Sequence, residues 1–172
     1  NGLSTPTAFD SNGDGKIDYV YAGDLKGNVW KFDLSGASDT AWAIANSGSA
    51  MFVAKDSGGL TQTITAPMSV VINTVAGDPN KDKPFVFFGT GSYFRTGDPA
   101  DAQVNTWYAL IDEGSTISGR SVLKQRTVST TTTFDGKPVR SFSSATAGDM
   151  TGKKGWYVDF STSTYERIVT KS

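Results

Sequence analysis

The nine residues from Asp10 to Asp18 constrain this chain more than any other stretch. They read Asp-Ser-Asn-Gly-Asp-Gly-Lys-Ile-Asp, so oxygen-bearing side chains stand at the first, third, fifth and ninth positions and a glycine at the sixth. This spacing matches the first nine positions of an EF-hand calcium loop, whose seventh residue supplies a backbone carbonyl. The candidate ligands are Asp10, Asn12, Asp14, the Lys16 carbonyl and Asp18. Because every one of them is an oxygen donor, Ca²⁺ is the predicted ion.

The loop departs from an EF-hand at its twelfth position, where Tyr21 replaces the bidentate glutamate. Residues 19–24 have the pattern of a β-strand in place of the exiting helix, which predicts a calcium loop grafted onto a β-hairpin. The alternative is a plain solvated turn, because Asn, Asp and Gly dominate turns for reasons unrelated to metals. Three carboxylates within nine residues repel one another, and a bound divalent cation would remove that repulsion.

Charge and hydropathy argue against two classes of partner. The chain has 172 residues, a net charge of −1 and no basic run, so the sequence predicts no nucleic-acid binding. No stretch approaches the roughly 20 apolar residues of a membrane span, and no signal-peptide pattern is present at the start. A first residue of Asn1 favours a mature or excised fragment of a longer protein.

Cysteine and histidine are both missing from the sequence. Without cysteine, disulfides play no part, and the sequence does not indicate the redox compartment. Without histidine, Ser-His-Asp and Cys-His catalysis and the usual zinc sites are excluded. These absences favour a protein that is not an enzyme.

The secondary-structure pattern is almost entirely β. The candidate strands are rich in Val, Tyr, Phe, Trp and Thr and are separated by Gly, Asp, Asn, Ser and Pro. They cover residues 18–24, 28–34, 50–55, 67–75, 84–89, 105–112, 122–133, 138–143, 155–161 and 165–171. The Ser/Thr run at 129–133 is placed in a strand because Thr is β-branched. One short helix is expected at 37–45.

Two segments of the chain repeat each other. Val20 to Gly23 match Val86 to Gly89, and Asn-x-Trp recurs at 28–30 and 105–107. A weaker third copy is Gly155 to Asp159 with 167–169 as its partner strand. Hairpins with a glycine after an apolar strand and a tryptophan on the next are typical of propeller blades. In that arrangement Trp30 and Trp107 would wedge between neighbouring sheets.

Two or three blades do not close a ring, and an open stack would expose apolar sheet faces. The predicted fold is therefore all-β, with residues 1–172 forming part of a β-propeller domain that carries a calcium-binding loop at 10–18. The rest of its own propeller is then one expected partner. The alternative is a self-contained β-sandwich.

Three stretches resemble a known family, in the family's order. The calcium loop followed by Tyr19 to Leu34 looks like the calcium-binding segment in the C-terminal domain of PilC/PilY-type proteins, the type IV pilus biogenesis factors and tip-associated adhesins of Gram-negative bacteria. Phe87 to Phe94 with Thr106 to Leu110 is similar to a second stretch of that family. Gly155 to Phe160, followed by Glu166-Arg167, resembles a third.

The resemblance implies a modified β-propeller of which this chain is a later part. It implies a calcium site formed by the residues named above, with calcium regulating pilus extension and retraction, surface attachment and twitching motility. By the same resemblance, the partners are minor or major pilins or a host cell surface. The expected location is extracellular or at the cell surface, at a pilus tip or on the outer membrane.

Two other functional classes stay open from the residues alone. A quinoprotein (PQQ-type) dehydrogenase is also a propeller with calcium beside its cofactor, although its blade signature and active-site Asp are not recognisable in this sequence. A purely structural cell-surface repeat would use calcium only for rigidity. A second, poorer cation site could lie at Gly97-Asp98-Pro99-Ala100-Asp101, for which a plain acidic loop is the simpler interpretation.

Overall fold

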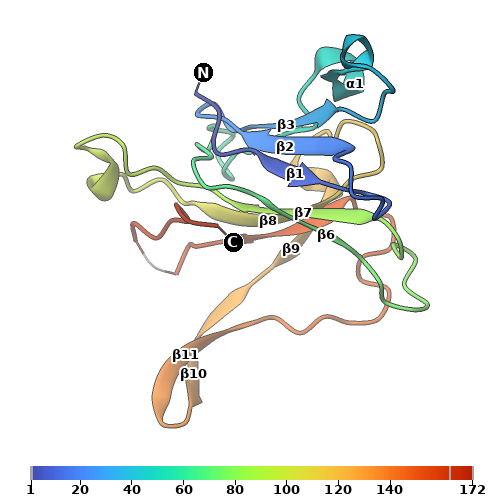
Figure 1. The fold of residues 1–172 in the computed structure, drawn as a ribbon. Helices are drawn as coiled ribbons and strands as arrows, with labels where there is room; N and C mark the ends of the chain where they lie inside the picture. Colours follow the sequence, from blue (N-terminus) through green and yellow to red (C-terminus); the bar gives the residue numbers. More distant parts are fainter. Residues whose placement is uncertain (1, 163, 172) are drawn as a thin grey trace.

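Two β-sheets lie face to face, as Figure 1 shows for this computed structural model, which describes residues 2–162 and 164–171. The first sheet has the order β1-β2-β3-β4, and β5 pairs with the other end of β3. Its strands are β1 (Thr7–Phe9), β2 (Tyr19–Gly23), β3 (Asn28–Asp33), β4 (Ala43–Ile44) and β5 (Phe52–Val53). The fold is all-β, as the residue pattern predicts.

The second sheet has the order β6-β7-β8-β12-β9. Its strands are β6 (Ser69–Ile72), β7 (Pro84–Gly89), β8 (Thr106–Ile111), β12 (Gly155–Asp159) and β9 (Lys124–Arg126). All neighbours are antiparallel except β12 and β9, which are parallel. Neither of these sheets closes on itself among the strands that the structure describes.

A two-stranded hairpin projects away from both sheets (Figure 1). It consists of β10 (Val128–Phe134) and β11 (Lys137–Phe142), which pair only with each other within the described part of the chain. Strand β10 contains the Ser/Thr run at 129–133, so that prediction is confirmed. Every residue of β11 is exposed.

The core lies between the facing sides of the two sheets. Strand alternation sends one set of side chains inward, and these are almost completely buried. They include Tyr21 and Val29 from the first sheet, Phe52 from β5, and Val86, Phe88, Tyr108 and Leu110 from the second sheet. Phe52 contacts Tyr108 with ring centroids 5.3 Å apart, and Phe88 stacks on Tyr108 at 5.0 Å.

Helical structure is confined to single turns. These are the 3-10 turns η1 (Asp39–Ala41), η2 (Asp98–Ala100) and η3 (Arg120–Val122) and the short α1 (Ala45–Gly48). The helix expected at 37–45 is therefore wrong, because that segment is one 3-10 turn followed by the extended strand β4. No helix among the described residues is long and apolar enough to cross a bilayer.

Two expectations about the C-terminal part are also wrong. Residues 165–171 form no strand, and the partners of β12 are β8 and β9 instead of 167–169. The prediction that Trp30 and Trp107 wedge between neighbouring blades is a separate matter, and it stays a prediction, because neither side chain lies between the two described sheets. Both alternate with core residues along their strands and so lie on the outer faces.

The repeat between the two hairpins is confirmed by a shared tertiary contact. A Cβ on Gly23 would lie 2.2 Å from Ile64, and a Cβ on Gly89 would lie 2.2 Å from Ile168. Ile64 donates its backbone N–H to the carbonyl of the residue after Gly23, at 3.0 Å, and Ile168 does the same after Gly89, at 3.0 Å. Each glycine is thus required because a later segment crosses directly over it.

Replacing Gly23 with alanine should lower the free energy of unfolding by about 1–3 kcal/mol, because Ile64 is fully buried and has little room to move. The matched control is Gly97→Ala, where an added Cβ meets nothing within 4 Å and φ is −81°. The control should change stability by less than about 0.5 kcal/mol. Urea denaturation measures both, and equal effects would contradict the close-approach explanation.

Candidate functional site

The loop at 10–18 connects β1 to β2 at the open end of a hairpin. Phe9 and Tyr19 are directly paired on either side of it. The backbone N–H of Asp18 donates to the Phe9 carbonyl at 3.1 Å, and the backbone carbonyl of Asp18 accepts the Leu34 N–H at 2.7 Å. The loop is therefore carried by a β-hairpin, as the sequence predicts, and β1, which the strand assignment missed, supplies its first arm.

Asp10 organises the first half of the loop. Its Oδ1 accepts the N–H groups of Asn12 at 3.2 Å and Gly13 at 2.7 Å, and its Oδ2 accepts the Gly15 N–H at 2.8 Å. These bonds, of which the one from Gly15 has the largest effect, hold the pKa of the Asp10 carboxyl below its usual range despite the opposing effect of desolvation. Gly13 and Gly15 have φ of 78° and 87°, the conformations that permit such tight winding.

The other predicted ligands continue the same winding. The Asn12 Oδ1 accepts the Asp14 N–H at 2.8 Å, and the Asp14 Oδ1 accepts the Lys16 N–H at 2.8 Å. Asp18 turns its Oδ2 toward Ser11, whose backbone N–H donates to it at 2.8 Å and whose hydroxyl donates to it as well. Most of the loop, from residue 11 to residue 17, is exposed.

The geometry of the loop at 10–18 supports metal binding only in part. Its donors are all oxygen, which is the set that Ca²⁺ prefers, and the chain winds around the Asp10 carboxylate. The structure does not bring the three carboxylates into one cluster, and the Asp18 carboxylate accepts bonds from Ser11. Among the residues that the structure describes, no group of three or more Asp, Glu, His or Cys side chains is arranged to hold a metal ion. The calcium site therefore stays a prediction.

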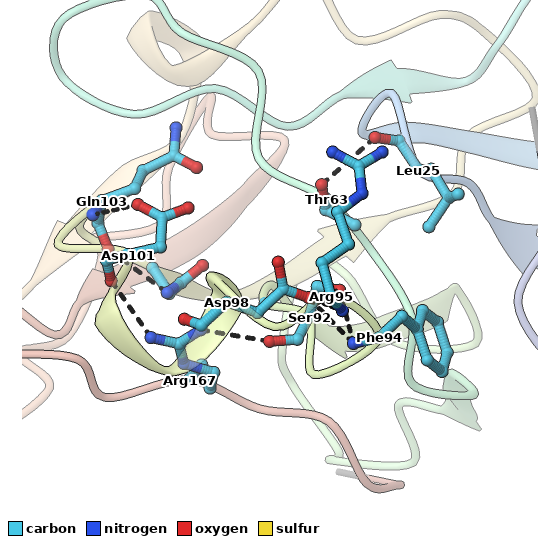
Figure 2. Close-up of a pocket in the computed structure, with 11 residues that line it drawn as sticks. Leu25, Thr63, Ser92, Phe94, Arg95, Asp98, Asp101, Gln103 and Arg167 are labelled. Atoms are coloured by element: carbon cyan, nitrogen blue, oxygen red, sulfur yellow. Dashed lines mark hydrogen bonds between the residues drawn. The ribbon is translucent and has the colours of Figure 1, made fainter.

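The acidic loop at 97–101 is occupied by a positively charged side chain of the same chain, that of Arg167. Figure 2 shows the Arg167 guanidinium among this loop, donating to the carbonyls of Ser92 at 3.1 Å, Asp101 at 3.1 Å and Asp98. The Asp98 carboxylate accepts the Ser92 hydroxyl at 2.6 Å and the amides of Phe94 and Arg95. These bonds lower the pKa of Asp98, and the bond from Ser92 has the largest effect. The plain-loop interpretation thus agrees with these contacts.

A small cavity of about 160 Å³ opens beside this loop and is bordered by the turn at Leu25 (Figure 2). Its wall is mostly polar and includes Arg95, Asp101 and Gln103. Gln103 is already committed, because its side-chain amide donates to Asp56 Oδ2 at 3.1 Å and to the Thr61 carbonyl at 3.1 Å. The wall therefore serves first to tie loops together.

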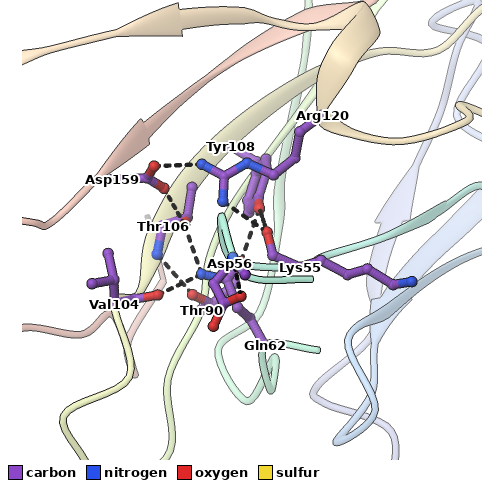
Figure 3. A network of polar contacts seen from close by, with 10 residues as sticks. Lys55, Asp56, Gln62, Thr90, Val104, Thr106, Tyr108, Arg120 and Asp159 are labelled. Atoms are coloured by element: carbon purple, nitrogen blue, oxygen red, sulfur yellow. Dashed lines mark hydrogen bonds and ion pairs between the residues drawn. The ribbon is translucent and has the colours of Figure 1, made fainter. Parts of the chain in front are cut away.

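A polar network joins the two sheets near the start of β8 (Figure 3). The Tyr108 hydroxyl donates toward the Lys55 carbonyl at 2.9 Å and the Gln62 Oε1 at 2.8 Å. Gln62 donates to Thr106 Oγ1 at 2.7 Å, and Thr106 donates to Asp159 Oδ1 at 2.7 Å. Burial is the main cause of the raised pKa of the Tyr108 phenol. The polar atoms of this network bond to one another, as expected of a structural network.

Arg120 completes this network from η3. Its guanidinium forms an ion pair with Asp159, donates to the Lys55 carbonyl at 2.9 Å and lies 4.1 Å from the centroid of the Tyr157 ring. Desolvation would lower the pKa of Arg120, but the surrounding partners outweigh it and the pKa is raised. Both oxygens of the Asp159 carboxylate therefore have a partner, Oδ1 in Thr106 and Oδ2 in Arg120.

A buried ion pair links the first sheet to the end of β8. Lys31 Nζ lies 2.7 Å from Asp112 Oδ2, which also accepts the Tyr21 hydroxyl at 2.6 Å. Burial alone would raise the pKa of Asp112, but the bonds from Lys31 and Tyr21 outweigh it and the pKa is lowered. Sequence analysis missed this trio, because Asp112 lies 91 residues from Tyr21 and no local pattern marks the pairing.

Comparisons with known proteins identify the family. The family model described as the PilY1 beta-propeller domain matches residues 1–133. A type IV pilus biogenesis factor PilY1 homolog from Xylella fastidiosa is 33% identical over 165 residues, covering 92% of this chain and 11% of that protein. Type IV pilus biogenesis factor PilY1 from Pseudomonas aeruginosa is 34% identical over 195 residues, covering 93% of this chain and 16% of that protein.

A solved structure agrees with these relatives. The crystal structure of the Pseudomonas aeruginosa PilY1 C-terminal domain superposes with a TM-score of 0.81 and 30% sequence identity, covering 98% of this chain and 41% of that chain. This chain thus spans a small part of its curated relatives and less than half of the solved domain. From these matches and the all-β fold, the chain belongs to the PilY1 β-propeller family.

Proposed function

We propose that this chain is the calcium-binding propeller module of a type IV pilus biogenesis factor and tip adhesin. In this role it is non-enzymatic, acts at the cell surface, and contacts pilins or a host surface together with the rest of its own propeller. Calcium would regulate pilus extension and retraction and surface attachment. The observation that carries the proposal is the oxygen-only loop at 10–18, held on a hairpin strand in a chain of the PilY1 family.

Asp10, Asn12, Asp14, the Lys16 carbonyl and Asp18 are the residues that would hold the ion. Bound Ca²⁺ supplies positive charge that offsets the repulsion among three carboxylates. The Asp18 Oδ2 accepts both bonds from Ser11, so the ion would need Asp18 either to turn or to offer its other oxygen. Since the loop lacks the bidentate twelfth-position glutamate, we expect a modest affinity, around the 10⁻⁴ M reached by the tighter extracellular modules or somewhat weaker.

The free energy available from this site limits what calcium can do. At a free Ca²⁺ concentration about 100-fold above Kd, binding stabilises the loaded state by roughly 2.7 kcal/mol. That is enough to order one exposed loop and too little to rearrange two packed sheets. Calcium is therefore proposed to act as an order–disorder switch on the surface that this loop presents to a partner.

Asp18→Ala tests the calcium site. Asp18 is the ligand that the hairpin fixes in place, so its loss should abolish measurable Ca²⁺ binding in titration calorimetry up to millimolar concentrations. Asp39→Asn is the matched control, since it removes one exposed carboxylate outside the loop and should leave the affinity unchanged. Unaltered binding by a folded Asp18→Ala protein would reject the assignment.

The regulatory part of the proposal needs a separate measurement in the bacterium. Piliated cells carrying Asp18→Ala should lose twitching motility and surface attachment, whereas cells carrying Asp39→Asn should behave as wild type. If Asp18→Ala removes calcium binding but leaves both behaviours intact, calcium only rigidifies the loop. In that case the regulatory function would be withdrawn and the metal site retained.

A further inference from the structure

The cavity of about 160 Å³ beside the loop at 92–101 holds polar groups that the protein itself does not use. The backbone N–H of Arg95 bonds to Asp98, but the Arg95 guanidinium has no hydrogen-bond or ion-pair partner among the residues that the structure describes. The Asp101 Oδ1 accepts the Gln103 backbone N–H at 2.9 Å, and its Oδ2 has no partner in the described part of the chain. Both side chains line the same cavity (Figure 2). A donor and an acceptor are therefore available to a ligand.

The charges that line this cavity balance one another. Arg95 and Arg167 bring two positive charges, Asp98 and Asp101 bring two negative charges, and no other charged residue of the described chain lines the cavity. An anion entering the cavity would meet two carboxylates, and a cation would meet two guanidinium groups. The cavity therefore favours an uncharged ligand that both donates and accepts hydrogen bonds.

Exposed apolar side chains border the polar wall. Phe94 is 76% exposed and Leu25 is 38% exposed, and Figure 2 shows both on the side of the cavity away from Asp101. The same two residues line a second cavity of about 210 Å³, together with Leu3. Phe94 thus borders two adjoining cavities. Exposed apolar surface beside a few convergent polar groups is typical of a ligand-binding groove.

The loop that carries Phe94 is fixed before any ligand arrives. The Asp98 Oδ2 accepts the backbone N–H groups of Phe94 at 2.8 Å and of Arg95 at 3.0 Å. Arg167 holds the start of the loop through the Ser92 carbonyl, at 3.1 Å. Binding would therefore lose little entropy from ordering the loop backbone, which favours recognition of a small ligand.

We propose that this cavity binds a neutral carbohydrate, with the hydroxyl groups of one sugar ring on Arg95 and Asp101 and the C–H face of the sugar on the Phe94 ring. A sugar hydroxyl donates to a carboxylate and accepts from a guanidinium at the same time, and neighbouring ring carbons each carry one. The cavity is smaller than the roughly 300–1,000 Å³ that drug-sized ligands occupy, so it suits a single ring. The adjoining cavity gives room for the second ring of a disaccharide. The inference does not rest on calcium binding at 10–18.

Saturation-transfer NMR on the protein at its natural length tests the proposal. The neutral probes are D-glucose, D-galactose, D-mannose, N-acetyl-D-glucosamine and lactose, and N-acetylneuraminic acid is the charged comparison. At least one neutral probe should bind with a Kd on the order of 1–10 mM, as expected of a ligand with about a dozen heavy atoms. No transfer to any neutral probe at about 50 mM, or tighter binding of the charged sugar, would overturn the proposal.

Phe94→Ala should weaken binding of that neutral probe at least about tenfold, because the sugar loses its apolar contact. Phe134→Ala is the matched control, since Phe134 is also 76% exposed but lies on the projecting hairpin. It should leave the Kd unchanged. Both side chains are exposed, so each variant should keep Tm within about 1 °C of wild type. Equal Kd values for Phe94→Ala and wild type would overturn the proposal.

Arg95→Ala tests the polar half of the site. It should also weaken binding at least about tenfold, because hydrogen bonds to a charged group are lost. An unchanged Kd in this variant would contradict the assigned contacts.

Asp18→Ala separates this inference from the proposed calcium function. That variant should bind the neutral probe as tightly as wild type, whether or not it binds calcium. Sugar binding that disappears in Asp18→Ala and persists in Phe94→Ala would overturn the placement of the sugar in this cavity.

Discussion

Replacing Asp112 with alanine should lower the free energy of unfolding by about 3–5 kcal/mol, measured by urea denaturation at pH 7. The side chain of Asp112 is only 2% exposed, and that of Lys31 is 10% exposed. The variant leaves the Lys31 ammonium in the sheet interface without its counter-charge and the Tyr21 hydroxyl without its acceptor. Uncompensated burial of a charge, more than the loss of an attraction, accounts for the size of this effect.

Glu113→Ala is the matched control for that experiment. Glu113 is the next residue and also contacts two lysines, Lys83 at 2.5 Å and Lys154, but its side chain is 27% exposed. Water screens such pairs, so the control should cost about 1 kcal/mol or less. If both variants destabilise equally, burial of the Asp112 pair does not explain its effect.

The same pair predicts a pH dependence. The pKa of Asp112 is lowered in the folded state, so its contribution is present above the unfolded value of about 3.9 and is lost as the pH falls through the folded value. The stability difference between wild type and Asp112→Ala should therefore shrink below about pH 4. A difference that stays constant down to about pH 2 would contradict this assignment.

Tyr108→Ala should also lower the free energy of unfolding by about 3–5 kcal/mol. Tyr108 is fully buried and its ring contacts those of Phe52 and Phe88. The ring therefore joins the two sheets, and its removal leaves a cavity that the rigid strands fill poorly. Thermal or urea unfolding gives the magnitude.

Tyr108→Phe separates the ring from the hydroxyl. It keeps the aromatic contacts but removes the bonds to the Lys55 carbonyl and to Gln62 Oε1. Since the Gln62 side chain is fully buried, its unpaired oxygen should cost about 1–3 kcal/mol. A loss as large as that of Tyr108→Ala would show that the polar network, and not the ring packing, dominates at this position.

Features that depend on neighbouring residues were predictable from the sequence. The alternating strands 19–23, 28–33, 84–89 and 106–111 formed as predicted, because their apolar period fits one buried sheet face. The winding of the loop at 10–18 was also predictable, since Gly13 and Gly15 take positive φ and Asp10 binds the amides that follow it. The strand expected at 165–171 did not form, because Ile168 instead crosses over Gly89.

The sequence alone determined the class of fold, the two repeated hairpins and the set of oxygen donors at 10–18, because each is recorded within a few residues of chain. Only the tertiary structure decided which side chains meet across the two sheets. It placed Asp112 against Lys31 and Tyr21, turned Asp18 toward Ser11, and left Trp107 and Trp156 together on the outer side of the second sheet. Those contacts join residues far apart in the chain, or choose among several partners for one carboxylate, and local pattern carries no information about either.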